Sequence, residues 1–265
     1  MPVEKGDFIL VDYVTKVEET GEIFDTTLKE TAQSSGIFKG DASYEPMLIV
    51  VGENWVLREL DQALIGLEVD TPTVITIPPE KAFGLRDPSK IRLMPIRRFR
   101  NQRVNLTPGT QIEVDGTLAV VRSVGSGRVQ LDFNPPLAGK TLIYDLTVKA
   151  KLDRVDEKIQ ALLHRRIPAV DVAKFNVQIR ARAREKEVII EPPTEAYYLD
   201  GVQYAKRGLA GDIQRFFPQF EKITFVERFI QAAPPADAAP PAPAGAPADT
   251  PPDPAAPEAS PDPPP

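Results

Sequence analysis

The sequence predicts an α+β protein whose antiparallel sheet packs on one short helix, with a small inserted β domain and a C-terminal α-β-β-α-β domain. Three observations predict this. Short runs rich in β-branched and aromatic residues alternate with Gly and Pro breaks along the first half of the chain. Residues 55–67 place apolar side chains at spacings of three and four, which is typical of a helix packed on a sheet. From residue 153 the pattern changes to helical and strand-like segments in a new order.

The first part is predicted to be an antiparallel sheet with a single helix. Gly66 lies near the end of helix 55–67, where a glycine commonly stops a helix. Residues 30–45, which contain Gly, Ser, Lys and Asp, predict an inserted surface loop. The expected strands are residues 8–17, 23–25, 47–51, 73–77 and 140–148.

Between Gly84 and Asn134 the pattern is that of a short meander of about three strands, separated by turns at Asp115-Gly116 and at residues 125–127. Such a unit is too small to be stable by itself. The C-terminal part is predicted to begin with helix 155–166. It continues with the strand pair 175–179 and 188–190, helix 201–217 and a last strand over 223–229. The predicted division is 1–89 plus 132–151, 90–131, 152–230, and a tail over 231–265.

The end of the chain has an unusual composition. Fourteen of the 28 prolines follow Ala232, in a stretch without aromatic, aliphatic β-branched or basic residues, so we expect it to be disordered. Removing its five acids from the 38 of the chain leaves 33 acids against 32 bases, so the rest is close to neutral. Bulk electrostatic capture of nucleic acid or of an anionic membrane is therefore not expected.

The composition also excludes several kinds of catalytic site. With no Cys the chain has no disulfide, thiolate nucleophile or Cys-ligated metal, and its single His makes a catalytic triad or a His-based metal site unfavourable. We expect neither a metal nor a cofactor. No run of eighteen apolar residues and no secretory signal are visible, which predicts a cytoplasmic protein without a membrane anchor.

Several short motifs in order resemble the FKBP family of peptidyl-prolyl cis-trans isomerases, and residues 60–84 are most similar to its SlyD-type subgroup. The resemblance extends over about 150 residues, and no single motif in it is decisive. The motifs are Phe24-Asp25, Gly52 with Val56-Leu57 and Leu60, Ala82-Phe83-Gly84, and Leu142-Ile143-Tyr144-Asp145.

The resemblance implies an enzyme that rotates Xaa-Pro bonds in an apolar pocket, with Asp25 as its single acid. The position of the family's Trp at the pocket floor holds Leu60, and Phe83 stands where many relatives have Tyr. Peptide orientation would then depend on the Leu57 N–H and on Tyr13 or Tyr144. Side chains of these types are also ordinary core residues. The implied catalytic residues are Tyr13, Phe24, Asp25, Val56, Leu57, Leu60, Phe83 and Tyr144, with Met47 binding substrate.

The resemblance also assigns a function to the inserted segment, which is where SlyD-like isomerases carry a domain that binds unfolded chains. The candidate client surface is Met94, Ile96, Phe99 and Leu106, with the alternative that these four form the core of the insert. A basic cluster could bind RNA or a ribosome, but a solvated face is the favoured interpretation. Its members are Lys90, Arg92, Arg97, Arg98, Arg100 and Arg103.

Long archaeal members of the family resemble the predicted layout, which implies a homodimer formed through the C-terminal domain. Residues 216–220, Phe-Phe-Pro-Gln-Phe, could support such an association or complete the local core. The expected partners are unfolded or nascent proline-containing polypeptides, and a ribosome contact has no support in the sequence. Two rival functions stay open: a non-catalytic holdase chaperone with a vestigial pocket, and a C-terminal unit that tethers the isomerase to another assembly.

Overall fold

The computed structural model describes residues 2–99, 105–182 and 185–229. The predicted tail and the basic residues Arg100 and Arg103 lie outside these ranges. The α+β class predicted from the sequence is confirmed, because three mainly antiparallel sheets are combined with few helices.

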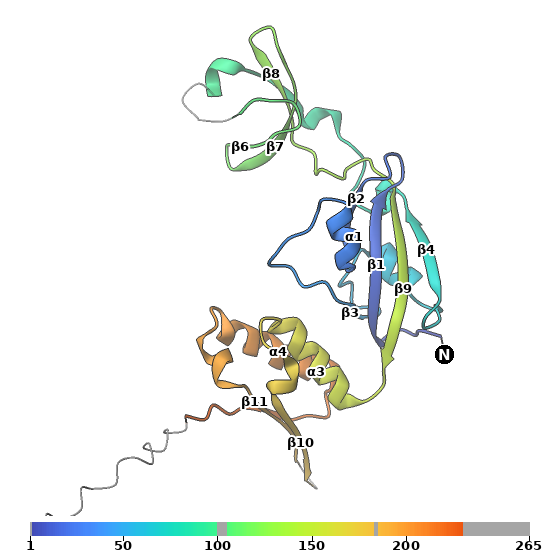
Figure 1. The fold of residues 1–265 in the computed structure, drawn as a ribbon, viewed down its shortest axis with the longest axis vertical. Coiled ribbons are helices and arrows are strands. Elements are labelled where there is room, and N and C mark those ends of the chain that lie inside the picture. The colour runs from blue at the N-terminus through green and yellow to red at the C-terminus, as the bar shows by residue number, and fades with distance from the viewer. Residues whose placement is uncertain (1, 100–104, 183–184, 230–265) are drawn as a thin grey trace, which may run out of the picture. The chain divides into compact units, whose positions relative to one another are not determined.

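The first sheet has five strands in the order β2-β1-β9-β4, with β3 also paired to β1. All its pairs are antiparallel, and β1 and β9 lie side by side along their whole length (Figure 1). Its strands are β1 (Phe8–Val17), β2 (Ile23–Thr26), β3 (Met47–Val50), β4 (Pro72–Ile77) and β9 (Leu142–Leu152).

One end of this sheet is apolar on both faces, because its first strand carries a continuous run rather than a strict alternation. Ile9 and Val11 of β1 face one hydrophobic cluster, while Phe8 and Leu10 face another. Successive side chains of a strand point to opposite faces, so a run of four apolar residues requires cover on both. The strand β3 follows the same rule, since its Ile49 belongs to the first cluster and its Leu48 to the second.

The first face is covered by the short helix α2 (Arg58–Ala63), whose Leu60 is buried together with Leu64 just beyond its end. This helix is shorter than the predicted 55–67. Leu57 has an extended backbone (φ −52°, ψ 135°) and Gly66 a positive φ of 89°, which bound the helical segment on both sides. The other departure from the prediction is α1 (Lys29–Ser34), which overlaps the start of the expected loop 30–45 and buries Ala32.

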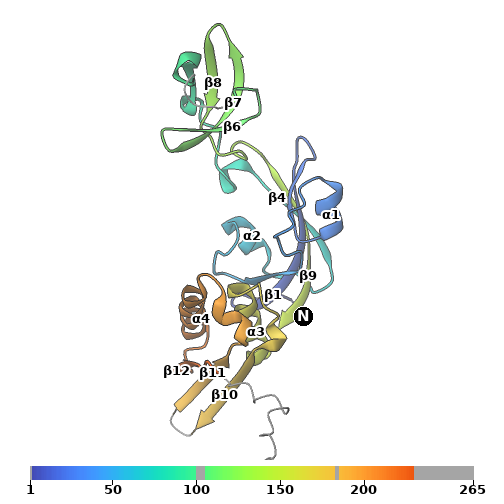
Figure 2. The same cartoon turned by 60° about the vertical axis from the view of Figure 1, so that its left-hand side comes forward.

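The second face is covered by the C-terminal unit, which has the predicted α-β-β-α-β order. Its helices α3 and α4 lie over the sheet β10-β11-β12, in which β11 and β12 are parallel (Figure 2). Phe8 contacts Phe216 and Phe217 through ring centroids 5.4 and 5.8 Å apart. The elements are α3 (Val155–Arg166), β10 (Asn176–Arg182), β11 (Glu185–Glu191), α4 (Val202–Phe216) and β12 (Lys222–Phe225).

The inserted segment is a four-stranded sheet in the order β5-β8-β7-β6. The strand β5 was not predicted, because it contains Pro95, and it lies at the sheet edge where proline is tolerated. Asp132, which is 3 % exposed, binds Arg86 and Arg122 where the chain returns from the insert. The strands are β5 (Ile91–Pro95), β6 (Gln111–Val114), β7 (Thr117–Gly125) and β8 (Arg128–Asp132).

Short 3₁₀ turns connect these elements. They are η1 (Pro79–Lys81), η2 (Pro88–Lys90), η3 (Ile96–Phe99), η4 (Val172–Lys174) and η5 (Thr194–Tyr198).

Candidate functional site

A cavity of about 220 Å³ lies between α2 and the inner face of the five-stranded sheet. Its lining is apolar except for two phenols and one carboxylate. Seven of the residues expected from the sequence line it: Tyr13, Asp25, Met47, Val56, Leu57, Leu60 and Tyr144.

The polar edge of this cavity is formed by Tyr13, Asp25 and Tyr144, which three adjacent strands bring together. Asp25 lies opposite Thr15 in the β1–β2 register, and Tyr144 lies opposite Thr15 in the β1–β9 register. The Tyr13 hydroxyl donates a 2.9 Å hydrogen bond to Asp25 Oδ2, and the two tyrosine rings are 6.4 Å apart. Asp25 and Tyr144, which are 119 positions apart in the sequence, therefore lie at the same edge of the cavity because β1 pairs with both β2 and β9.

Both phenols are held in the protonated form. Burial, with the negative charge of Asp25 second, raises the pKa of Tyr144 to about 12. The same two causes and the hydrogen bond to Asp25 raise the pKa of Tyr13 above its ordinary value. At neutral pH each hydroxyl is therefore a hydrogen-bond donor and not a base.

Two donors at the cavity have no acceptor within the described part of the chain: the Leu57 N–H and the Tyr144 hydroxyl. Leu57 directly precedes α2, where a helix leaves backbone N–H groups unpaired. Because Tyr13 already donates to Asp25, the structure favours Tyr144 over Tyr13 as the hydroxyl that could bind a peptide carbonyl.

The loop that carries Val56 and Leu57 is held by Asp61, which the sequence analysis did not identify. This carboxylate is 3 % exposed and accepts hydrogen bonds from the Gly52 N–H at 2.9 Å and the Asn54 N–H at 3.0 Å. Gly52 has a φ of 89°, and a Cβ there would meet the Lys5 side chain at 2.7 Å. Asp61 thus positions the cavity wall without facing the cavity.

Two expected site residues do not line this cavity. Phe24 lines a neighbouring cavity instead, and Phe83 is 43 % exposed and lines neither of the two. The assignment of Phe83 to the pocket wall is therefore not supported by its position, because its side chain is turned to solvent.

Four lining residues were missed in the sequence, where they have the pattern of ordinary core. Each could have been found by a step of two along a strand or four along a helix from a residue that was identified. They are Val11, Ile49, Leu64 and Leu146.

The client surface expected on the insert is corrected at Phe99, whereas Met94, Ile96 and Leu106 are half-buried. Phe99 is 3 % exposed and belongs to the core of the insert, against which Met94, Ile96 and Leu106 are packed. These four residues therefore pack in or against the core of the insert, as the alternative interpretation expected. Leu93 and Leu118, at 61 % and 66 %, are the most exposed large apolar side chains of the insert sheet among the described residues, and Val124 follows at 40 %.

Of the two interpretations left open for residues 216–220, the packing of their phenylalanines agrees with completion of the local core. Phe217 and Phe220 are buried in the core, and Phe216 packs on Phe8 and on Trp55. Trp55 packs against the core that the five-stranded sheet shares with the C-terminal unit.

The family model described as FKBP26, IF domain matches residues 92–137, and the model described as FKBP26_C-terminal matches residues 155–230. A short-type peptidyl-prolyl cis-trans isomerase from Methanocaldococcus jannaschii is 35 % identical over 147 residues, which cover 56 % of this chain and 92 % of the relative.

Two bacterial relatives are similar at lower identity. An FKBP-type 16 kDa peptidyl-prolyl cis-trans isomerase from Escherichia coli is 27 % identical over 55 % of this chain and 91 % of the relative. The isomerase SlyD from Helicobacter pylori is 28 % identical over 49 % of this chain and 72 % of the relative. The chain therefore belongs to the FKBP-type peptidyl-prolyl cis-trans isomerases and is SlyD-like.

Among the described residues, no three His, Cys, Asp or Glu side chains gather as ligands for a metal ion. No helix in the described ranges has the length and apolar character needed to cross a membrane.

Proposed function

We propose that the cavity beneath Tyr13 and Tyr144 binds the proline of an Xaa-Pro segment in an unfolded or nascent polypeptide and accelerates rotation of that bond. The barrier is roughly 18–20 kcal/mol because resonance keeps the C–N bond planar. Lowering it requires no nucleophile, metal or cofactor, which suits a site made of apolar side chains, two phenols and one carboxylate.

The chemistry follows from differential binding. An apolar cavity that excludes water disfavours the charge-separated resonance form and so weakens the double-bond character of the amide. The Leu57 N–H and the Tyr144 hydroxyl would hold the carbonyls on either side while the bond turns, and an enzyme that binds the twisted amide better than either planar form is a catalyst. Asp25, bound to Tyr13, orients this edge of the cavity. The observation that carries the proposal is the pair of donors without an acceptor among the described residues, beside an apolar cavity of about 220 Å³.

A protease-coupled assay on a short Xaa-Pro peptide tests the activity, with Asp25→Ala as the variant. The wild type should accelerate isomerisation and the variant should be slower. If the wild type gives no acceleration and still suppresses aggregation of an unfolded protein, the holdase alternative replaces the enzyme.

We also propose that the insert binds unfolded chains, through Leu93 and Leu118 rather than through its core. Leu93 lies on β5, an edge strand whose open side can pair with an extended chain. Leu93→Ser with Leu118→Ser should weaken suppression of aggregation and leave turnover of short peptides unchanged. Equal suppression by this double variant and the wild type would reject the surface.

The remaining proposals concern organisation. We propose that the chain has four parts: 1–89 plus 132–151, 90–131, 152–230 and 231–265. We also propose an archaeal origin, a cytoplasmic location and a homodimer formed by the C-terminal unit. Tyr198 and Tyr204, 78 % and 82 % exposed, support an association surface there. The mass of the full chain in solution, compared with Tyr198→Ser/Tyr204→Ser, tests the dimer, which is rejected if the wild type is a monomer. A ribosome contact gains no support.

A further inference from the structure

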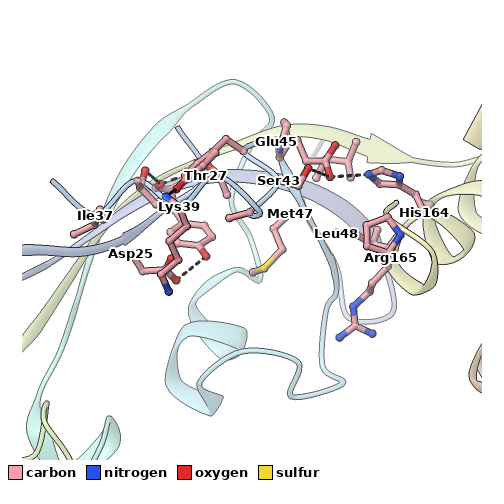
Figure 3. Close-up of a pocket in the computed structure, with 18 of the residues that line it drawn as sticks. Asp25, Thr27, Ile37, Lys39, Ser43, Glu45, Met47, Leu48, His164 and Arg165 are labelled. Carbon is pink, nitrogen blue, oxygen red and sulfur yellow. Dashed lines mark hydrogen bonds and ion pairs between the residues drawn. The ribbon is translucent and has the colours of Figure 1, made fainter. Parts of the chain in front are cut away.

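A second cavity, of about 380 Å³, adjoins the prolyl cavity and shares Tyr13, Asp25 and Met47 with it. Figure 3 shows Met47 near its middle, with Asp25 and Lys39 towards one end and His164 and Arg165 towards the other. An extended polypeptide whose proline occupies the first cavity can therefore continue into the second over the three shared side chains.

The far wall of the second cavity comes from the C-terminal unit. Helix α3 contributes Ala161, His164 and Arg165, and Pro168 follows it. The His164 ring is bonded through Nε2 to Glu45 Oε1 at 2.6 Å, which joins α3 to the loop before β3. The buried leucines of α3 also hold this helix in place, because they pack in the same hydrophobic core as Leu48 of β3.

The acidic and basic side chains that line the second cavity differ in whether they have a partner. Its two carboxylates have partners, because Asp25 accepts from Tyr13 and Glu45 is bonded to His164. Its two cations do not: within the described ranges neither Lys39 nor Arg165 forms an ion pair with a carboxylate.

Arg165 is the better placed of these cations. Its guanidinium lies 3.7 Å from the centroid of the Trp55 ring, which fixes the planar group against a partly buried surface. Burial, together with the nearby Arg166, lowers the pKa of Arg165 from its ordinary value, so the cation is disfavoured where it stands. A carboxylate brought to it would remove part of that cost.

We propose that α3 forms the second half of the peptide-binding site, and that Arg165 binds an acidic side chain of the client polypeptide a few residues from its proline. The inference extends the proposed isomerase function from the prolyl ring to the neighbouring chain. The C-terminal unit then contributes to substrate choice in addition to any association.

The test is a set of proline peptides long enough to enter both cavities. One Glu is moved residue by residue along both flanks of the proline, and Gln peptides serve as the neutral partners. For the wild type, kcat/KM should be about fivefold higher for Glu than for Gln at one flanking position and equal elsewhere. High salt should reduce that ratio, since the lining is partly open to solvent.

Three substitutions of Arg165 locate the effect. Arg165→Gln should bring the Glu/Gln ratio to about one, Arg165→Lys should keep part of the preference, and Arg165→Glu should favour peptides with Lys at the same position. The matched control is Arg207→Gln, an exposed arginine of α4 outside both cavities, which should keep the wild-type ratio. A wild-type ratio of one at every position, or an unchanged ratio in Arg165→Gln, overturns the proposal.

Trp55 gives a binding signal that does not depend on turnover, because it is the only tryptophan of the chain and touches Arg165. The Glu peptide should change its emission at lower concentration than the Gln peptide. If a short peptide is not isomerised and this difference is still found, the isomerase function fails and the acidic subsite stands. If short peptides are isomerised and both peptides titrate alike, the subsite fails and the isomerase stands.

Discussion

The Tyr13 hydroxyl donates a hydrogen bond to Asp25, and this bond leaves the neighbouring Tyr144 hydroxyl as the phenol with no partner in the described residues. The two tyrosines lie at the same edge of the cavity, but their hydroxyl groups differ in their hydrogen bonding. Tyr13 holds the carboxylate of Asp25 in place, and Tyr144 is the residue that we propose binds substrate.

Removing each hydroxyl separates these tasks. Tyr13→Phe should lower the free energy of unfolding by about 1 kcal/mol, because an intramolecular hydrogen bond is lost. Tyr144→Phe should change that free energy by less than about 0.5 kcal/mol, yet reduce kcat/KM about tenfold. Urea unfolding and the protease-coupled assay measure the two effects. Equal activity of Tyr144→Phe and wild type would return the carbonyl-binding role to Tyr13.

Leu60 and Phe83, both assigned to the pocket from the sequence, should behave differently. Leu60 is 4 % exposed on the cavity floor, so Leu60→Ala should cost about 2–4 kcal/mol of unfolding free energy and lower turnover. Phe83 is 43 % exposed and outside the lining, so Phe83→Ala should cost less than about 1 kcal/mol with little change in kcat/KM. A loss of turnover in Phe83→Ala as large as in Leu60→Ala would show that Phe83 moves into the site with substrate bound.

Asp132 gives a pH-dependent contribution to stability. Burial alone would raise its pKa, but hydrogen bonds from Asn134 and Arg122 and the charge of Arg86 outweigh burial, so the pKa lies below its ordinary value. The stabilisation is therefore complete above the unfolded-state pKa of about 3.9 and is lost as pH falls through the lower folded-state pKa.

Asp132→Asn should cost about 2–3 kcal/mol at neutral pH, because two arginines lose their buried partner. Urea unfolding between pH 7 and strongly acidic pH measures this, and the difference between variant and wild type should shrink towards acid. A constant difference would mean that Asp132 acts by packing alone. Asp115→Asn, at an exposed pair with Arg98, is the control and should cost less than about 1 kcal/mol.

Removing residues 153–265 should destabilise the isomerase sheet, because it exposes Phe8, Leu48 and Val50, which are buried against α3 and α4. Loss of several buried side chains at roughly 1.5–3 kcal/mol each is large compared with the stability of a domain. Thermal melting and binding of an apolar dye measure the effect, and removal of residues 230–265 alone is the control. A truncated protein that melts with the wild type would show that the two units fold independently.

Much of the fold could be predicted because it depends on local pattern. Helix α3 occupies the predicted residues 155–166, since its apolar spacing and the following Pro168 act within the segment itself. The strand β5 was missed because it contains Pro95, which is tolerated where the strand lies at a sheet edge, and the helix α1 was missed because its segment was predicted as a loop.

Most of the residues that line the cavity beside α2 were named from the sequence, although through resemblance and not through spacing. Val11 and Leu146 were missed because a residue that lines a cavity and a residue that fills a core have the same apolar pattern. Asp61 left no such pattern, since its partners are backbone N–H groups that its own helix brings into reach.

By itself the sequence determined the class of fold, the order of its three units, the family and the absence of cysteine chemistry, because these follow from composition, periodicity and motif order. Only the tertiary structure decided which of the two cavity phenols has no partner among the described residues, that Phe83 is largely exposed, and that helix α3 forms a wall of the second cavity. The physical reason lies in the run from Phe8 to Val11. Its composition shows that two faces need cover, but only the packed chain shows which segments cover them.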